Sequence, residues 1–156
     1  MEFANALDEY ARASATLIDA VRVVRVDQLD RAASDGWTPR QIVHHVADSE
    51  TQSYVRLRRL VAEPPGSLIQ GYDEAAWAEC AALGYRELPI EGALQIFSTV
   101  RAASLNVLAR LGPDDFERYG EHSESGRYTI AQWLDIYTRH PLEHTRQLHE
   151  ALGDDS

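Results

Sequence analysis

Three histidines of this 156-residue chain have the type and spacing that could bind one metal ion. His140 and His144 are four residues apart, so on a helix their directions differ by roughly 40° and they are stacked about 6 Å along the axis. His45 lies on the apolar stripe of another predicted helix. Imidazole nitrogen is a common ligand of zinc, nickel and related ions, and two rings at this spacing can reach the same ion. The pattern therefore predicts a three-histidine site for one divalent transition metal.

The two helices that carry these histidines begin with the same capping signal. Thr38 and Thr129 each precede a predicted helix and are followed by glutamine three residues later. His45 is seven residues after Thr38, and His140 and His144 are eleven and fifteen residues after Thr129. These offsets differ by four residues, which is about one helical turn. The three histidines therefore have a similar rotational position relative to the cap of their own helix. The competing interpretation is three core histidines with separate hydrogen bonds, but burying three imidazoles without a shared partner would be costly.

Three neutral imidazoles leave at least one coordination position open, which is typical of a catalytic site rather than a structural one. A bound divalent ion can lower the pKa of water to about 7, or it can activate a thiolate. The site is thus compatible with hydrolysis of an amide or ester, with transfer of a low-molecular-weight thiol, or with metal binding without turnover in a stress protein. For hydrolysis, Asp48 and Glu143 are candidate catalytic proton carriers, since each lies three residues from a ligand. Their alternative interpretation is solvated surface charge.

Composition excludes several other classes of function. The net charge is −10 and all fifteen cationic residues are arginines, so nothing favours nucleic acid or an anionic membrane, and Schiff-base chemistry on lysine is excluded. Cys80 is the single cysteine, which excludes an intramolecular disulfide and a cysteine-rich zinc site. The sequence shows no signal-peptide pattern and no apolar run of membrane-spanning length. We expect a cytoplasmic protein that acts on a small molecule.

Hydrophobic periodicity predicts four long helices and no regular strand. We expect a long connection over Ser67–Pro89 with a short helix around Asp73–Cys80, and a loop over Asp114–Tyr128 with room for a short hairpin. This pattern predicts an all-α fold: a four-helix bundle with a long crossover containing a short extra helix, in a single domain over residues 1–156. The expected long helices are Phe3–Leu29, Pro39–Ala62, Pro89–Leu111 and Ile130–Leu152.

Two further polar residues bear on the site. Arg101 falls on the apolar stripe of the third long helix, so we expect it to pair with a buried carboxylate, with an anionic substrate as the alternative. His122 lies in a polar loop and is expected to be exposed to solvent. The stretch from His140 to His144 also matches the His-x-x-Glu-His zinc-peptidase motif, but that motif needs a third ligand well downstream, and only twelve residues follow.

Three stretches of the chain carry a recognisable pattern: WTPRQIVHHVADS over Trp37–Ser49, Tyr72-Asp73-Glu74-x-x-Trp77, and Tyr137-x-x-His140-x-x-x-His144. From about Trp37 onward the chain resembles the DinB/YfiT-like superfamily, most closely its YfiT-like branch of metal-dependent hydrolases. The resemblance implies a four-helix bundle, often a homodimer, with a three-histidine site for nickel or zinc. Its first ligand matches His45, and its pair on the last helix matches His140 and His144. Pro141, inside that pair, departs from the pattern and removes one backbone hydrogen bond.

Overall fold

The central helices α2 and α5 begin at the two capping boxes that the sequence predicts. In the computed structural model, which describes residues 2–32 and 36–153, α2 spans Pro39–Ala62 and α5 spans Ile130–Leu152. The Thr38 hydroxyl accepts a hydrogen bond from the Gln41 N–H at 3.2 Å, and the Gln41 side chain accepts one from the Thr38 N–H at 2.9 Å. The same pair of bonds precedes α5 at Thr129. Each box satisfies N–H groups that a helix leaves without partners, and so fixes where the helix begins.

The first helix is shorter than its apolar pattern predicts. Helix α1 spans Glu2–Arg22, seven residues short of the expected end at Leu29, and a 3-10 turn follows over Val26–Gln28. The Gln28 side chain accepts a hydrogen bond from the Arg25 N–H at 2.9 Å, which closes this turn. The segment is also rich in β-branched valines, which have a lower helix propensity than unbranched residues. Helix α4 spans Glu91–Leu108, close to the range expected for it.

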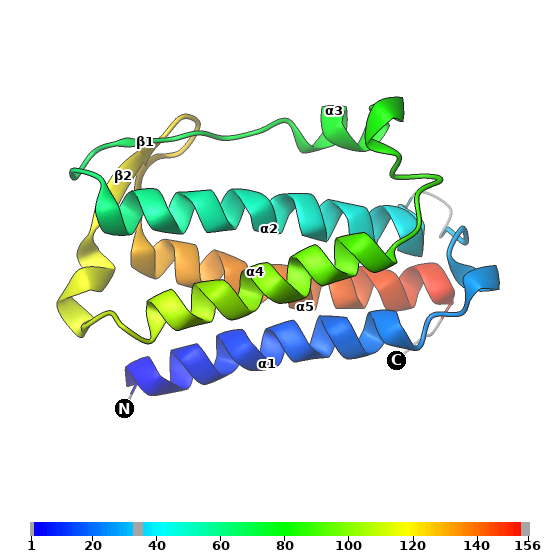
Figure 1. Cartoon of the computed structure of the whole chain (residues 1–156), viewed down its shortest axis with the longest axis horizontal. Helices are drawn as coiled ribbons and strands as arrows, with labels where there is room; N and C mark the ends of the chain where they lie inside the picture. Colours follow the sequence, from blue (N-terminus) through cyan, green and yellow to red (C-terminus); the bar gives the residue numbers. More distant parts are fainter. Residues whose placement is uncertain (1, 33–35, 154–156) are drawn as a thin grey trace.

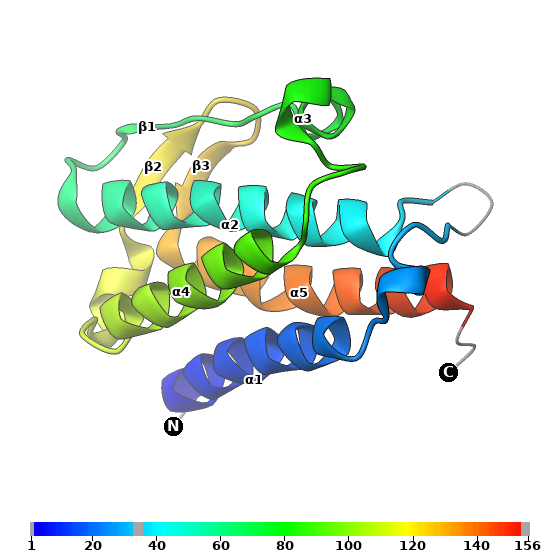
Figure 2. The same ribbon diagram turned by 45° about the vertical axis from the view of Figure 1, so that its right-hand side comes forward.

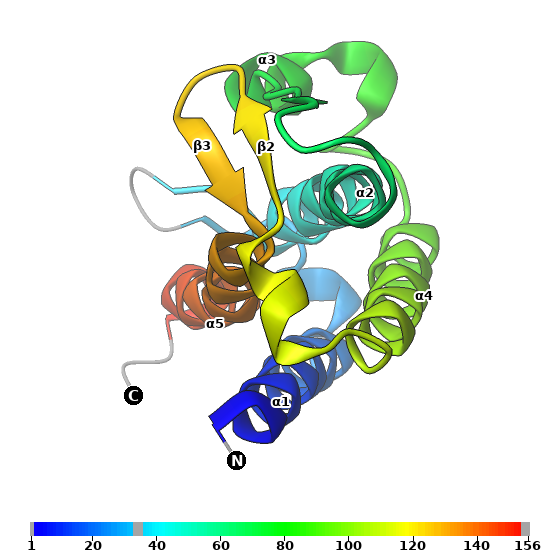
Figure 3. The ribbon, with the colours of Figure 1, turned by 90° about the vertical axis from the view of Figure 1, so that its left-hand side faces the viewer.

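The four long helices α1, α2, α4 and α5 lie side by side as a bundle (Figure 1). Viewed from one end, α1 and α2 occupy opposite corners, and α4 and α5 occupy the other two (Figure 3). The sequence colours show that α2 and α4 run in the same direction, while α1 and α5 run in the other. Because α2 and α4 are parallel neighbours, the chain between them must return along the whole bundle. The predicted four-helix bundle with a long crossover is therefore confirmed.

The crossover and the last connection meet in a small sheet that the sequence analysis anticipates only in part. Strand β1 pairs in parallel with β2, and β2 pairs antiparallel with β3. The β2–β3 hairpin falls in the predicted loop, whereas the two-residue β1 is too short to give an alternating pattern. The sheet and the short helix α3 cover one side of α2 (Figure 2). The elements are β1 (Leu68–Ile69), α3 (Glu74–Glu79), 3-10 turns at Ala81–Leu83 and Pro113–Glu117, β2 (Tyr119–His122) and β3 (Gly126–Thr129).

The core fills the bundle as two apolar clusters. One lies near the sheet around Tyr10 and Trp133, and the other lies around Leu17 and Phe97. The Trp133 indole N–H donates a hydrogen bond to the Ser53 carbonyl at 3.0 Å, which satisfies its polar atom inside the core. In the part of the chain that the structure describes, no helix is both long and apolar enough to cross a membrane. Several buried residues are polar: Ser14, Gln41, His45, Ser49, Glu50, Ser53, Arg101, Ser104 and Thr145.

Gly120 allows β2 to approach the crossover, and its replacement tests this contact. A Cβ at Gly120 would lie 2.6 Å from the Ser67 carbonyl oxygen and 2.6 Å from Ile69 Cγ1, so Gly120→Ala should lower the free energy of unfolding. We expect a loss of about 1–3 kcal/mol, measured by urea denaturation. The control is Gly92→Ala on α4, where nothing lies within 4 Å of the added Cβ. That variant should gain up to about 1 kcal/mol, and equal losses in both would contradict the assigned contact.

Candidate metal centre

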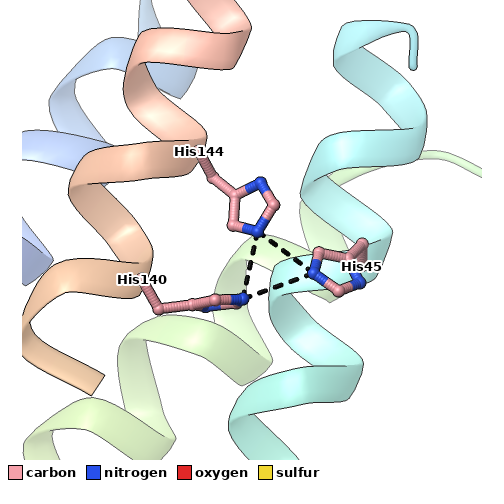
Figure 4. Close-up of side chains that lie close together, drawn as sticks. All are labelled: His45, His140 and His144. Atoms are coloured by element: carbon pink, nitrogen blue, oxygen red, sulfur yellow. Dashed lines mark hydrogen bonds between the residues drawn. The ribbon is translucent and has the colours of Figure 1, made fainter. Parts of the chain in front are cut away.

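The Nε2 atoms of three histidines from two antiparallel helices converge on one point (Figure 4). His45 comes from α2, and His140 and His144 come from successive turns of α5. The Nε2 of His45 lies 3.3 Å from that of His140 and 3.1 Å from that of His144, and the remaining pair is 3.0 Å apart. The structure thus brings together the three residues that the helical phase selects.

Hydrogen bonds among the rings cannot satisfy all three of these contacts. Each Nε2 carries either one proton or one lone pair. The Nδ1 of His144 lies 2.7 Å from the Gln147 side-chain oxygen, which only accepts, so the Nε2 of His144 presents a lone pair. Any placement of protons on His45 and His140 then leaves at least one contact with two lone pairs or two protons facing each other. A cation between the three nitrogens removes every such conflict.

The separations of the three nitrogens fit a metal ion as well. Ligand nitrogens about 2.0–2.1 Å from an ion, at angles of about 95–105°, are roughly 3.0–3.3 Å apart. The observed separations of 3.0, 3.1 and 3.3 Å fall in this range. Three imidazoles without a thiolate or carboxylate suit nickel and zinc among several divalent ions. The donor set therefore fits one such ion and leaves the remaining coordination positions open.

Burial keeps all three imidazoles in the neutral form that a metal binds. Burial, reinforced by the neighbouring His144, lowers the pKa of His45 to about 3. Burial, reinforced by the other two histidines and by Arg101, lowers the pKa of His140 to about 2. The pKa of His144 is also lowered by burial, although its bond to Gln147 opposes the shift. The three rings therefore do not have to lose a proton before they bind an ion at neutral pH.

The three histidines are not equally buried. His45 is 2% exposed, and its ring packs against the Trp37 ring at a centroid distance of 4.8 Å. His140 and His144 are only half-buried. His140 is also part of the wall of a cavity.

Arg101 repairs the backbone defect that Pro141 introduces between two of the histidines. Helix α5 continues through Pro141, which has no N–H to donate to the Tyr137 carbonyl four residues earlier. A guanidinium N–H of Arg101 takes that place and donates to the Tyr137 carbonyl oxygen at 2.6 Å. The proline that departs from the resemblance is thus accommodated without ending the helix. The turn that spaces His140 and His144 is held by a side chain from α4.

The same arginine meets the buried carboxylate that the sequence analysis expects. Its guanidinium lies 3.6 Å from Oε1 of Glu50, and the two side chains are 2% and 0% exposed. It also donates to the Ser14 hydroxyl at 2.6 Å and to the Tyr10 carbonyl at 2.9 Å. Burial raises the pKa of Glu50, and the positive charge of Arg101 opposes that shift. Arg101 therefore ties α4 to the other three long helices next to the histidine cluster.

The two predicted proton carriers lie outside the histidine cluster. Glu143 is exposed, with its carboxylate 3.8 Å from an Arg139 nitrogen. Asp48 is half-buried, one turn beyond His45, and accepts a hydrogen bond from the Tyr85 hydroxyl at 2.5 Å. Their catalytic roles stay predictions.

A cavity of about 230 Å³ adjoins the cluster, and the sequence analysis missed several residues of its wall. Arg56 is eleven residues after His45, which is three helical turns in the same phase, so the stripe that identifies His45 could have identified it too. His122 is half-buried here rather than exposed, because the β2–β3 hairpin folds it against α2 and α5. No local pattern signals that placement. The cavity is lined by Ser49, Arg56, Tyr72, Glu74, His122, Glu124, Ile136, Tyr137 and His140.

Comparisons with known proteins agree with this fold. The model of the DinB superfamily matches residues 9–148. A protein of Oceanobacillus iheyensis named "putative metal-dependent hydrolase" is 39% identical over 119 residues, which cover 76% of this chain and 67% of that protein. YfiT from Bacillus subtilis, described as "a probable metal-dependent hydrolase with an unusual four-helix bundle topology", has a TM-score of 0.85 at 28% identity, covering 96% of this chain and 85% of its own. TT2238, a four-helix bundle protein, shares the fold, with a TM-score of 0.66 at 21% identity that covers 95% of this chain and 98% of its own.

The pairing of Arg101 with Pro141 predicts energetic coupling between the two residues. In a Glu50→Gln background, which avoids leaving a buried charge alone, Arg101→Met should destabilise the protein. The loss should be about 1 kcal/mol smaller when Pro141→Ala is also present, because the alanine supplies the N–H that the Tyr137 carbonyl needs. Urea denaturation of the four variants measures this coupling. Additive effects would mean that Arg101 does not replace the missing backbone donor.

Proposed function

The chain belongs to the DinB superfamily, and on that premise we propose that it is a metal-dependent hydrolase whose His45, His140 and His144 hold one divalent transition-metal ion. The observation that carries the proposal is the convergence of three Nε2 atoms within 3.3 Å of one another, with no arrangement of protons that satisfies them. The relatives named as metal-dependent hydrolases support the same chemistry. Nickel and zinc are the proposed ions, because both suit imidazole ligands.

The protein's own residues would prepare the site in three ways. Gln147 fixes the tautomer and orientation of His144, and the Trp37 ring packs against His45, so the ligands are ordered before an ion arrives. The three ligands are uncharged, so they leave the positive charge of an ion uncompensated. When bound, a divalent ion supplies Lewis acidity and lowers the pKa of a water molecule to about 7. The cavity beside His140 would hold the amide or ester substrate.

Asp48 is the better placed of the two proposed proton carriers. It is half-buried one turn beyond His45 on α2, whereas Glu143 is exposed beside Arg139. The Tyr85 hydroxyl donates to its carboxylate, and burial together with this bond raises the pKa of Tyr85. Tyr85 therefore stays protonated, and its hydroxyl orients the Asp48 carboxylate.

Metal analysis of variants tests the ligand set. We expect about one divalent ion per chain in the wild-type protein and a loss of most of that metal in His140→Ala, because two imidazoles bind far more weakly than three. His149→Ala is the matched control, since it removes a histidine from the same helix but outside the cluster, and it should keep its metal. Elemental analysis after dialysis gives the ion content. Equal metal in the two variants would refute the assignment.

Activity assays distinguish hydrolysis from thiol transfer. The metal-loaded protein should hydrolyse activated 4-nitrophenyl esters faster than the same protein treated with a chelator, and returning nickel or zinc should restore the rate. The same samples should be offered a low-molecular-weight thiol together with an electrophilic aromatic dye. Thiol-dependent conjugation without ester hydrolysis would favour an S-transferase. Metal binding with neither activity would favour a protein that binds metal without turnover.

A further inference from the structure

Arg56 presents spare hydrogen-bond donors to the cavity that adjoins the histidine cluster. Its guanidinium donates to the Tyr137 hydroxyl at 3.0 Å and to the Gln70 carbonyl at 3.1 Å, so it is oriented from two sides by neutral acceptors. These two bonds use only part of the five N–H groups of arginine. Its Nε is buried and has no hydrogen-bond partner among the residues that the structure describes. The arginine is therefore held in place with binding capacity left over.

Arg56 has no carboxylate within ion-pair distance among the residues that the structure describes. Within residues 2–32 and 36–153, no ion pair within 4.0 Å includes Arg56. Arg40 and Arg101 differ from Arg56 in this respect, since Arg40 pairs with Asp30 and Arg101 lies beside Glu50. The partly buried Arg58 and Arg118 also form no ion pair among the described residues, but Arg58 lies over the Tyr54 ring and Arg118 donates to the Leu60 carbonyl, and neither lines this cavity. A partly buried cation without a counter-charge is costly and favours an anionic ligand.

Other groups on the cavity wall are also donors. The Tyr72 hydroxyl is buried without a hydrogen-bond partner in the described part of the chain, and burial raises its pKa, so it keeps its proton. The Nδ1 of His122 accepts hydrogen bonds from the backbone N–H groups of Glu124 and Ser125 at 3.2 and 3.4 Å. The proton of a neutral His122 must therefore be on Nε2, which makes that atom a donor. Arg56 and Tyr72 thus supply the wall with donors that lack an acceptor among the described residues, and His122 supplies a third donor.

Two exposed carboxylates limit how much negative charge the cavity can take. Glu74 and Glu124 belong to the same lining but are exposed, which places them at the rim. Burial raises the pKa of Glu74, Arg56 opposes the shift, and Glu124 adds to it by repulsion. A ligand with one inward anionic group and a neutral or cationic outer end fits this distribution, whereas a second anionic group at the rim would be repelled.

We propose that this cavity binds the carboxylate group of a small monoanionic substrate through Arg56 and Tyr72, and so presents the rest of that molecule to the three-histidine site. The proposal rests on the proposed function and names its substrate class. The volume of about 230 Å³ is below the ~300–1,000 Å³ of sites for drug-sized ligands and matches roughly eight water molecules. A substrate of about the size of benzoate fits this space.

Binding of benzoate and of its neutral analogue benzamide tests the proposal, because the two differ mainly in charge. The wild-type protein should bind benzoate at least about tenfold more tightly, as measured by calorimetry or by NMR titration. In Arg56→Met this preference should disappear. The matched control Arg59→Met removes the same charge from an exposed position on the same helix, where Arg59 pairs with Glu63, and it should keep the preference. A preference that survives Arg56→Met overturns the proposal, and so does the absence of measurable benzoate binding at millimolar concentration.

Tyr72→Phe separates binding from stability. Removing a buried hydroxyl that has no partner should leave the melting temperature unchanged or raise it, while benzoate affinity falls several-fold. Unchanged affinity would exclude Tyr72 from the site. The titrations should be repeated with chelator-treated protein. Benzoate that is bound by the metal alone would lose its affinity when the metal is removed and would keep it in Arg56→Met. If the protein prefers benzoate but does not hydrolyse esters, the anion site is supported and only the proposed hydrolase activity is refuted. If it hydrolyses esters without preferring benzoate, the hydrolase activity is supported and the anion site is refuted.

Discussion

The convergence of three imidazole nitrogens inside the bundle is the constraint on which the rest of the structure depends. No placement of protons satisfies all three contacts at 3.0–3.3 Å, so the arrangement is stable only where the surrounding helices impose it or a cation relieves it. The helices impose it by their start points and their packing. The capping boxes at Thr38 and Thr129 set the phase of α2 and α5, and the antiparallel contact of these helices makes the histidine faces meet. The Gln147 bond then selects the tautomer in which a lone pair points inward.

Pro141 and Arg101 show how a local defect is resolved by a distant residue. A proline in the turn between two ligands would leave the Tyr137 carbonyl without a donor in the helix interior, a cost comparable to a lost buried hydrogen bond. The Arg101 guanidinium supplies that donor and also contacts the Tyr10 carbonyl, the Ser14 hydroxyl and Glu50. Burying this charge is itself expensive, and the full set of acceptors offsets the expense. The outcome is one cation that joins all four long helices beside the cluster, which restricts how far His140 and His144 can shift relative to His45.

The parts of the fold that the sequence predicts are those with local causes. The boundaries of α2 and α5 follow from their caps, and the bundle follows from periodic apolar faces and from the long connection between α2 and α4. The predicted end of α1 at Leu29 was wrong, because the apolar pattern continues past Arg22 although the helix ends there. The pairing of β1 with β2 could not be predicted, because it joins two short segments that are about fifty residues apart and carry no pattern. The position of His122 depends on that pairing, so its place in the cavity wall could not be predicted either. Arg56 was different: its phase on α2 was available, but a single cation on a helix face does not reveal whether a carboxylate will meet it.

The shared phase of His45 and Arg56 has a consequence for how substrates of different length would be distinguished. The two residues are eleven positions apart on one continuous helix, so their backbones are separated by roughly 16 Å along the axis. Helical side chains lean toward the N-terminus, which directs the long side chain of Arg56 back toward His45 and shortens this span. The Tyr137 hydroxyl, from the turn before His140, holds the guanidinium in that position. Because α2 and α5 are rigid elements of the bundle, the spacing between a carboxylate at Arg56 and a reacting group at the histidines is fixed by helical geometry rather than by mobile loops. A molecule whose anionic group is too near to the reacting bond, or too far from it, could contact Arg56 or the histidine site but not both.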